Sequence, residues 1–196
     1  MKISASILAA NKEHIFEDIL LHINDFDLLH IDIGDNIFCP TYGVSYKVLY
    51  ELNKQNEYKL DLHLMIENPL SVYSNIKELK LETVTVHCEA VTTDEFTKLK
   101  GENYKLGIGI LSSTPLNLLE DYLLEAESLL LLCVKPGFSN QVPVVSPIER
   151  VRDFKYTYPN YTGMITVDGG VQGHMLNKLE DLGVDIAVQG GAIFDN

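Results

Sequence analysis

The sequence predicts an α/β fold, a (β/α)8 TIM barrel in a single domain over residues 1–196, with a short or missing last helix. Three observations predict it. Short apolar segments alternate with segments of helical spacing, one segment is apolar throughout, and glycine-bearing turns follow the last segments. Alternation of strands and helices implies right-handed crossovers and a parallel sheet, and eight such units suit closure into a barrel.

The strands are expected where apolar and β-branched residues run between turn signals. These segments are residues 2–8, 28–33, 59–65, 83–87, 106–110, 129–134, 164–167 and 185–189. The run LLLLCV, which begins at Leu129, is typical of a strand buried on both faces.

Helical spacing fills most of the intervals, as at residues 13–23, 69–79, 147–156 and 172–182. An open doubly wound sheet is the alternative arrangement. The turns KPGFSNQ, VDGGV and VQGGAIF favour the barrel, because they follow the sixth, seventh and eighth strands. In a TIM barrel the loops after the last strands bind phosphate through backbone amides. The chain ends soon after the eighth strand, so the last helix is expected to be short or missing.

The net charge of −13 argues against nucleic acid or an anionic membrane as a partner, because both need a basic surface. An anionic ligand must then be bound locally, by backbone amides. No apolar window approaches a spanning length, and the N-terminus alternates, which predicts a cytoplasmic protein. Cys39, Cys88 and Cys133 are odd in number and form no CxxC pattern, so they are expected to be reduced.

Candidate metal ligands lie where predicted strands end. His30 and Asp32 are two residues apart on one strand and so share a face, and barrel closure brings His63 and Asp168 to the same centre. Mixed imidazole and carboxylate ligands suit zinc, iron or manganese better than calcium, so one divalent ion per chain is predicted. The alternatives are a structural carboxylate at Asp32 and a turn residue at Asp168.

His87 also ends a predicted strand. A buried structural histidine is as good an interpretation there as a pocket residue, so His87 is not included in the predicted site.

Seven motifs then identify a resemblance that spans nearly the whole chain. SASILAAN, HIDIGDNIFCP, DLHLMIENP, HCEA, KPGFSNQ, VDGGV and QGGAIF follow the order and spacing of the ribulose-phosphate 3-epimerase family. The resemblance implies a barrel isomerase that inverts C3 of ribulose 5-phosphate to give xylulose 5-phosphate. It makes His30, Asp32, His63 and Asp168 the metal ligands, with Asp32 and Asp168 as the catalytic acid and base.

Inversion of a carbinol carbon beside a ketone explains these residue types. One group removes the proton on one face, another returns a proton on the opposite face, and a Lewis acid stabilises the enediolate between them. The resemblance also implies a sugar-phosphate ligand, a homo-oligomer and a set of substrate-binding residues. These are Ser6, Met65, Gly137, Phe138, Ser139, Gly169, Gly170, Gly190 and Gly191.

Departures from the family pattern affect the predicted substrate wall. Gly34 and Leu132 stand where the family usually has methionine, and Asn36 stands where it has glycine. The usual PGFGGQ reads PGFSNQ here; Asn140 tolerates a positive φ more readily than Ser139. Lys135 adds a cation beside this loop.

Two alternatives follow from these departures. The smaller Gly34 leaves room for a hexulose 6-phosphate such as allulose 6-phosphate as the substrate. The altered wall as a whole also suits a weakly active paralogue that binds a sugar phosphate. Another phosphate-binding barrel, such as a lyase or synthase, does not need the four ligands together.

Overall fold

Eight parallel strands close into a barrel, in the sequence order β1 to β8, with β1 also pairing with β8. The computed structural model describes residues 1–195. The strands are β1 (Lys2–Ser6), β2 (Leu28–Gly34), β3 (Leu60–Met65), β4 (Thr83–His87), β5 (Lys105–Ile110), β6 (Ser128–Leu132), β7 (Met164–Asp168) and β8 (Ile186–Gln189). The predicted fold class is therefore confirmed, and the open doubly wound sheet is excluded.

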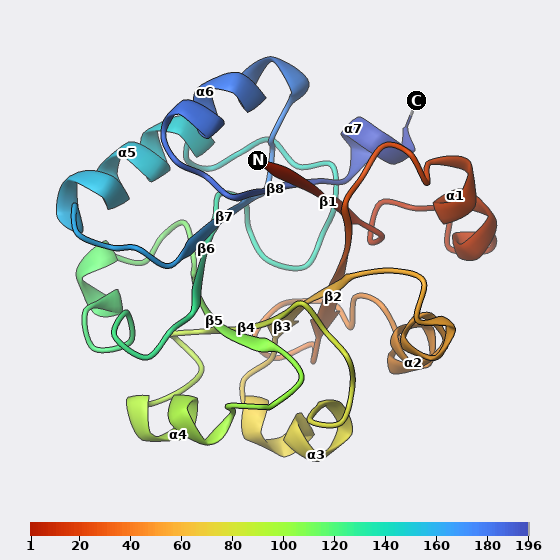
Figure 1. The fold of residues 1–196 in the computed structure, drawn as a ribbon, viewed down its shortest axis with the longest axis horizontal. Helices are drawn as coiled ribbons and strands as arrows, with labels where there is room; N and C mark the ends of the chain where they lie inside the picture. Colours follow the sequence, from red (N-terminus) through yellow and green to blue (C-terminus); the bar gives the residue numbers. More distant parts are fainter. Residues whose placement is uncertain (196) are drawn as a thin grey trace.

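The helices form a ring outside the barrel (Figure 1). They are α1 (Ile15–Leu21), α2 (Tyr46–Gln55), α3 (Tyr73–Ile76), α4 (Thr93–Lys98), α5 (Pro147–Thr157), α6 (Leu176–Asp181) and α7 (Gly191–Phe194). Short 3₁₀ helices add η1 (Pro69–Val72), η2 (Leu116–Leu119) and η3 (Gly173–Met175). In the described part of the chain, η2 is the helix between β5 and β6. Within residues 1–195, the helix that follows β8 is α7, which is short, as expected.

Two predicted helices are shorter than expected. Residues 69–79 divide into η1 and α3, and residues 172–182 divide into η3 and α6. Pro69 follows the capping residue Asn68, whose side chain accepts from the Ser71 amide, and this tight turn starts the segment as a 3₁₀ helix. Helical periodicity in the sequence does not distinguish the two helix types.

The first strand is shorter than predicted because the chain turns directly after Ser6. The amide of Ala9 donates to the Ser6 carbonyl at 3.1 Å, and this turn ends the ladder. The predicted sixth strand ends at Leu132 rather than at 134, and the seventh extends to Asp168. Each of these shifts puts a pocket residue at a strand end.

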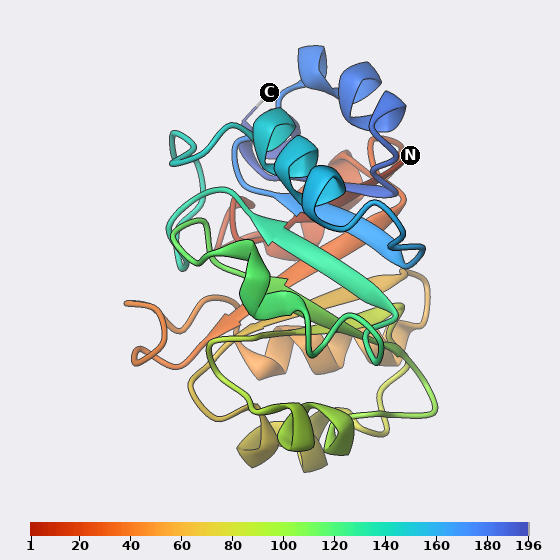
Figure 2. The ribbon, with the colours of Figure 1, turned by 90° about the vertical axis from the view of Figure 1, so that its left-hand side faces the viewer.

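The carboxyl ends of the strands lie on one side of the barrel, opposite the N-terminus (Figure 2). Apolar residues such as Val84 and Val86 are buried toward the helices, whereas alternate positions on the same strands face the barrel axis. Among those inner residues, the side chains of Ser4 and Thr83 both donate to Asp61, on β3. A buried polar layer therefore underlies the carboxyl end of the barrel, where enzymes of this fold place their sites.

Candidate active site

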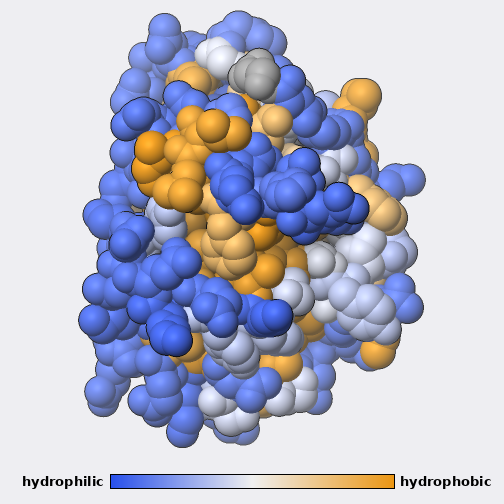
Figure 3. All heavy atoms as spheres, turned by 90° about the vertical axis from the view of Figure 1, so that its right-hand side faces the viewer, coloured by the Kyte–Doolittle hydropathy of each residue, from blue (hydrophilic) through white to orange (hydrophobic). Residues whose placement is uncertain are grey.

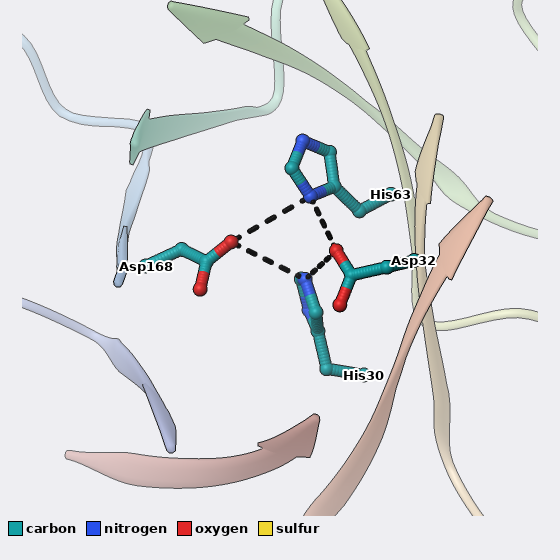
Figure 4. A group of neighbouring side chains, drawn as sticks. All are labelled: His30, Asp32, His63 and Asp168. Atoms are coloured by element: carbon teal, nitrogen blue, oxygen red, sulfur yellow. Dashed lines mark hydrogen bonds and ion pairs between the residues drawn. The ribbon is translucent and has the colours of Figure 1, made fainter. Parts of the chain in front are cut away.

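The four predicted metal ligands converge at the carboxyl end of the barrel. His30 and Asp32 come from β2, His63 from β3 and Asp168 from the end of β7. Their ligand atoms all lie within 4.8 Å of one another, and Figure 4 shows the two aspartates on opposite sides of the histidine pair. Asp32 and His63 are neighbours in the β2–β3 register, which explains how residues 31 positions apart meet.

Four of the separations between these atoms lie close to those expected of ligands around one ion. His63 Nδ1 lies 2.9 Å from Asp32 Oδ1 and 3.6 Å from Asp168 Oδ2. His30 Nε2 lies 3.3 Å from Asp32 Oδ1 and 3.6 Å from Asp168 Oδ2. Ligands bonded to a zinc-like ion at about 2.0–2.2 Å stand roughly 3.0–3.6 Å apart. The arrangement therefore fits a divalent transition metal.

His30 supplies a second test of that fit. Its Nδ1 lies 2.7 Å from Asp61 Oδ2, and a carboxylate partner favours the proton on Nδ1. Nε2 then carries a free lone pair that can bind a metal ion. Among the described residues, Nε2 is a buried polar atom without a hydrogen bond. A buried imidazole nitrogen with a free lone pair, close to two carboxylates, fits a ligand of a divalent cation.

The electrostatics of the cluster also favour a cation. Burial disfavours the charged form of Asp32, yet the neighbouring His30 and His63 outweigh burial and lower its pKa. Burial likewise opposes charge on His30, but Asp32 and Asp61 raise its pKa well above the usual value. The three carboxylates of the cluster carry more negative charge than the two histidines can neutralise. The site therefore attracts a proton or a metal ion.

A pocket of about 460 Å³ opens above the cluster. Asp32 and Asp168 form part of its floor, and all the predicted substrate-binding residues line it. These are Ser6, Met65, Gly137, Phe138, Ser139, Gly169, Gly170, Gly190 and Gly191. The Ser6 hydroxyl donates to Asp32 Oδ2 at 2.8 Å and fixes the orientation of that carboxylate.

The loop after β6 has its positive φ values at a glycine and an asparagine. Gly137 and Asn140 have positive φ values of 108° and 56°, whereas Ser139 does not have a positive φ. Asn140 Nδ2 donates to Asp195 Oδ2 at 2.8 Å, which joins the loop to the residue after α7. Lys135 lines the same pocket and is exposed.

Gly34 does not widen the pocket, contrary to the prediction for a longer substrate. A side chain at Gly34 would meet the Thr41 carbonyl oxygen and, at 2.6 Å, Cys39 Sγ. The loop after β2 folds back onto its own strand, and the Gly34 amide donates to the Tyr42 carbonyl at 3.0 Å. The space that the glycine leaves is therefore filled by backbone and by Cys39. Asn36, with a φ of 60°, also lies outside the lining of the pocket.

Two residues behind the candidate ligands were absent from the predicted site: Asp61, which was not considered, and His87, which was considered and left out. Asp61 contacts His30, and His87 Nε2 lies 2.8 Å from His63 Nε2. The strand period contained both signals, because Asp61 is two residues before His63, and His87 ends a strand of alternating threonine and valine. Which histidine nitrogen each one contacts could not be predicted from that period.

A closed barrel with histidines and carboxylates at the carboxyl ends of its strands belongs to the class of TIM-barrel enzymes. The ribulose-phosphate 3 epimerase family matches residues 2–194, and the chain belongs to this family. The predicted resemblance is thus confirmed. The family consists of isomerases of the racemase and epimerase class that act on carbohydrates, which confirms the predicted enzyme class.

The relatives agree over nearly the whole chain. Ribulose-phosphate 3-epimerase from Aquifex aeolicus is 33% identical, over 99% of this chain and 90% of the relative. The enzyme of that name from Mycobacterium leprae is 29% identical, over 98% and 87%. Among solved structures, KGPDC from Streptococcus mutans superposes with a TM-score of 0.73 at 10% identity, covering 100% of this chain and 90% of the other. That likeness shows the fold alone.

No helix among residues 1–195 combines the length and the apolar character needed to cross a bilayer.

Proposed function

We propose that this protein is a metal-dependent epimerase that inverts C3 of a ketose phosphate and interconverts ribulose 5-phosphate and xylulose 5-phosphate. The observation that carries the proposal is the placement of Asp32 and Asp168 on opposite sides of a histidine pair, at the floor of a pocket lined by glycine turns (Figure 4). His30, Asp32, His63 and Asp168 would hold one divalent ion, zinc, iron or manganese.

The two aspartates divide the proton transfers between the two faces of C3. One carboxylate removes the C3 proton, and the other delivers a proton to the opposite face, so the configuration inverts. When bound, the metal supplies a Lewis acid that stabilises the negative charge of the enediolate oxygens. Ser6 holds Asp32 by its hydroxyl, which keeps one carboxylate oxygen directed at the reacting carbon.

The phosphate is proposed to bind at the three glycine turns. They lie at Gly137 to Ser139, Gly169 to Gly170 and Gly190 to Gly191, and all three turns line the pocket. Backbone amides are the expected donors because the chain has a net charge of −13. Lys135, which lines the same pocket, adds one positive charge.

Solvent exchange tests the reaction. Metal-loaded protein incubated with ribulose 5-phosphate in deuterated water is expected to place deuterium at C3. Absence of exchange with every pentulose and hexulose phosphate tried, together with tight sugar-phosphate binding by calorimetry, would identify the protein as a non-catalytic binder. A higher kcat/KM for allulose 6-phosphate than for ribulose 5-phosphate would make the hexulose phosphate the substrate. The filled space at Gly34 gives that alternative substrate no support.

The Gly191→Val variant tests the phosphate site. Gly191 is not among the glycines with positive φ, and a side chain there would meet Asn140 Oδ1 and, at 2.6 Å, Asp195 Oδ2 rather than backbone. We expect KM for the phosphorylated ketose to rise about 10- to 100-fold, because a hydrogen bond to a charged group contributes about 1.5–3 kcal/mol. Metal content and turnover of the non-phosphorylated ketose should change little.

Gly173→Val is the matched control, because an added side chain at Gly173 meets no atom within 4 Å. An equal loss for the phosphorylated and the non-phosphorylated ketose in Gly191→Val would show that this turn is structural and that phosphate binds elsewhere.

Assembly and location stay predictions. Leu20, Leu21 and Ile23, at the end of α1, are exposed by 57%, 80% and 42%. Figure 3 shows an apolar patch on the face of the molecule that carries α1. We propose that the protein is cytoplasmic and forms a homo-oligomer. Sedimentation of the purified protein would test the oligomeric state.

A further inference from the structure

His63 is the one ligand of the four whose far side meets a second histidine. His63 Nδ1 faces Asp32 and Asp168, and its Nε2 lies 2.8 Å from Nε2 of His87. Two imidazole nitrogens at that distance share one proton, carried by one ring and accepted by the other. The proton's position decides whether Nδ1 of His63 has a lone pair to give to a metal.

The His87 ring cannot rotate away from His63. Its ring is fully buried between His63, at a centroid distance of 5.0 Å, and Phe38, at 4.9 Å. Its remaining nitrogen, Nδ1, makes no hydrogen bond within residues 1–195 and lies 3.3 Å from Oε2 of Glu89, an electrostatic contact. A carboxylate repels a bare nitrogen lone pair and attracts an N–H, so Glu89 favours the His87 tautomer with the proton on Nδ1.

Glu89 is itself held in place. The Leu111 amide donates to Oε1 of Glu89 at 2.9 Å. The guanidinium of Arg150, on α5, donates to the carbonyls of Leu111 and Thr114, at 2.9 Å each. Arg150 therefore fixes the loop after β5 in place, and the Leu111 amide holds the Glu89 carboxylate beside His87.

We propose that His87 and Glu89 are positioning residues that hold His63 as its Nε2–H tautomer, so that Nδ1 is presented to the metal. With the proton of His87 on Nδ1, its Nε2 is a lone pair that must accept from His63 Nε2–H. His63 then has its own lone pair at Nδ1, 2.9 Å from Asp32 Oδ1, and a metal ion held there would take the place of a proton between the two atoms. This inference rests on the proposed metal site and adds a three-residue chain from Glu89 on the β4 loop to the metal.

The test measures zinc affinity, by competition with a chelator, in variants of His87. His87→Leu removes the acceptor, and we expect zinc affinity to fall about 10- to 100-fold, the usual cost of losing an orienting partner. His87→Gln offers an amide oxygen to His63 Nε2–H and should stay within about threefold of the wild type. His174→Leu, at an exposed histidine, is the control.

Glu89→Leu, measured alone and in combination with His87→Leu, tests the contact sequence from Glu89 through His87 to His63. Because Glu89 acts through His87, the double variant should bind zinc no more weakly than His87→Leu alone. Additive losses would remove Glu89 from the proposal. An unchanged zinc affinity in His87→Leu would overturn the role of His87. Equal losses of affinity in His87→Leu and His87→Gln would also overturn it, because His87 would then only fill space.

Nitrogen-15 NMR of the histidine rings in zinc-loaded wild-type protein keeps the proposal testable if a variant fails to fold. The expected result is a proton on Nδ1 of His87 and on Nε2 of His63. A proton on Nε2 of His87 would overturn it. Failure of the wild type to bind any divalent metal would instead contradict the proposed function, so the two failures are distinguishable.

Discussion

His63→Ala is expected to abolish both metal binding and turnover while the barrel stays folded. His63 Nδ1 contacts both carboxylates of the cluster, so its loss opens the ligand set on the side shared by Asp32 and Asp168. Loss of an orienting partner costs about 10- to 100-fold in affinity, and loss of a direct ligand should exceed about 100-fold. Elemental analysis of protein never exposed to chelator, together with C3 exchange, measures the two effects.

His63→Gln is the companion variant, because it retains much of the side-chain volume and guards against a trivial packing defect at this fully buried position. His174→Ala, at an exposed histidine, should keep full activity and metal content. Retained turnover in His63→Ala with no bound metal would show that the metal site is wrongly assigned.

Asp168→Asn is expected to retain much of the metal and to lose epimerisation. An amide oxygen can still face the ion, but it cannot cycle a proton at neutral pH, so turnover should fall about 10²- to 10⁴-fold. Exchange at C3 should survive for one epimer, because Asp32 still removes the proton that points to its own face. Deuterium exchange measured separately for ribulose 5-phosphate and xylulose 5-phosphate tests this asymmetry.

Asp32→Asn should show the opposite epimer preference, since Asp32 and Asp168 come from β2 and β7 and approach the histidines from opposite sides (Figure 4). Asp121→Asn, at an exposed aspartate on the barrel exterior, is the control. Equal residual exchange from both epimers in either active-site variant would contradict the assignment of one face to each aspartate.

The sequence alone determined the barrel and the positions of the four candidate metal ligands. Alternation of strands and helices is a local pattern, and parallel closure then places every strand's carboxyl end on one side. His30, Asp32, His63 and Asp168 could therefore be chosen from strand ends without any knowledge of distances. The glycine turns after β6, β7 and β8 could be assigned to the same end of the barrel. The positive φ at Asn140 was also predictable, because asparagine tolerates that backbone and serine does so less readily.

Only the tertiary structure decided what lies behind and beside those ligands. Asp61 and His87 occupy inward positions that periodicity predicts, but their partners come from neighbouring strands, and the register sets which nitrogen of His30 or His63 each one meets. Gly34 shows the same limit in reverse. Its missing side chain suggested a wider pocket, yet the loop after β2 folds into that space, because a loop path depends on contacts that its own sequence does not encode locally.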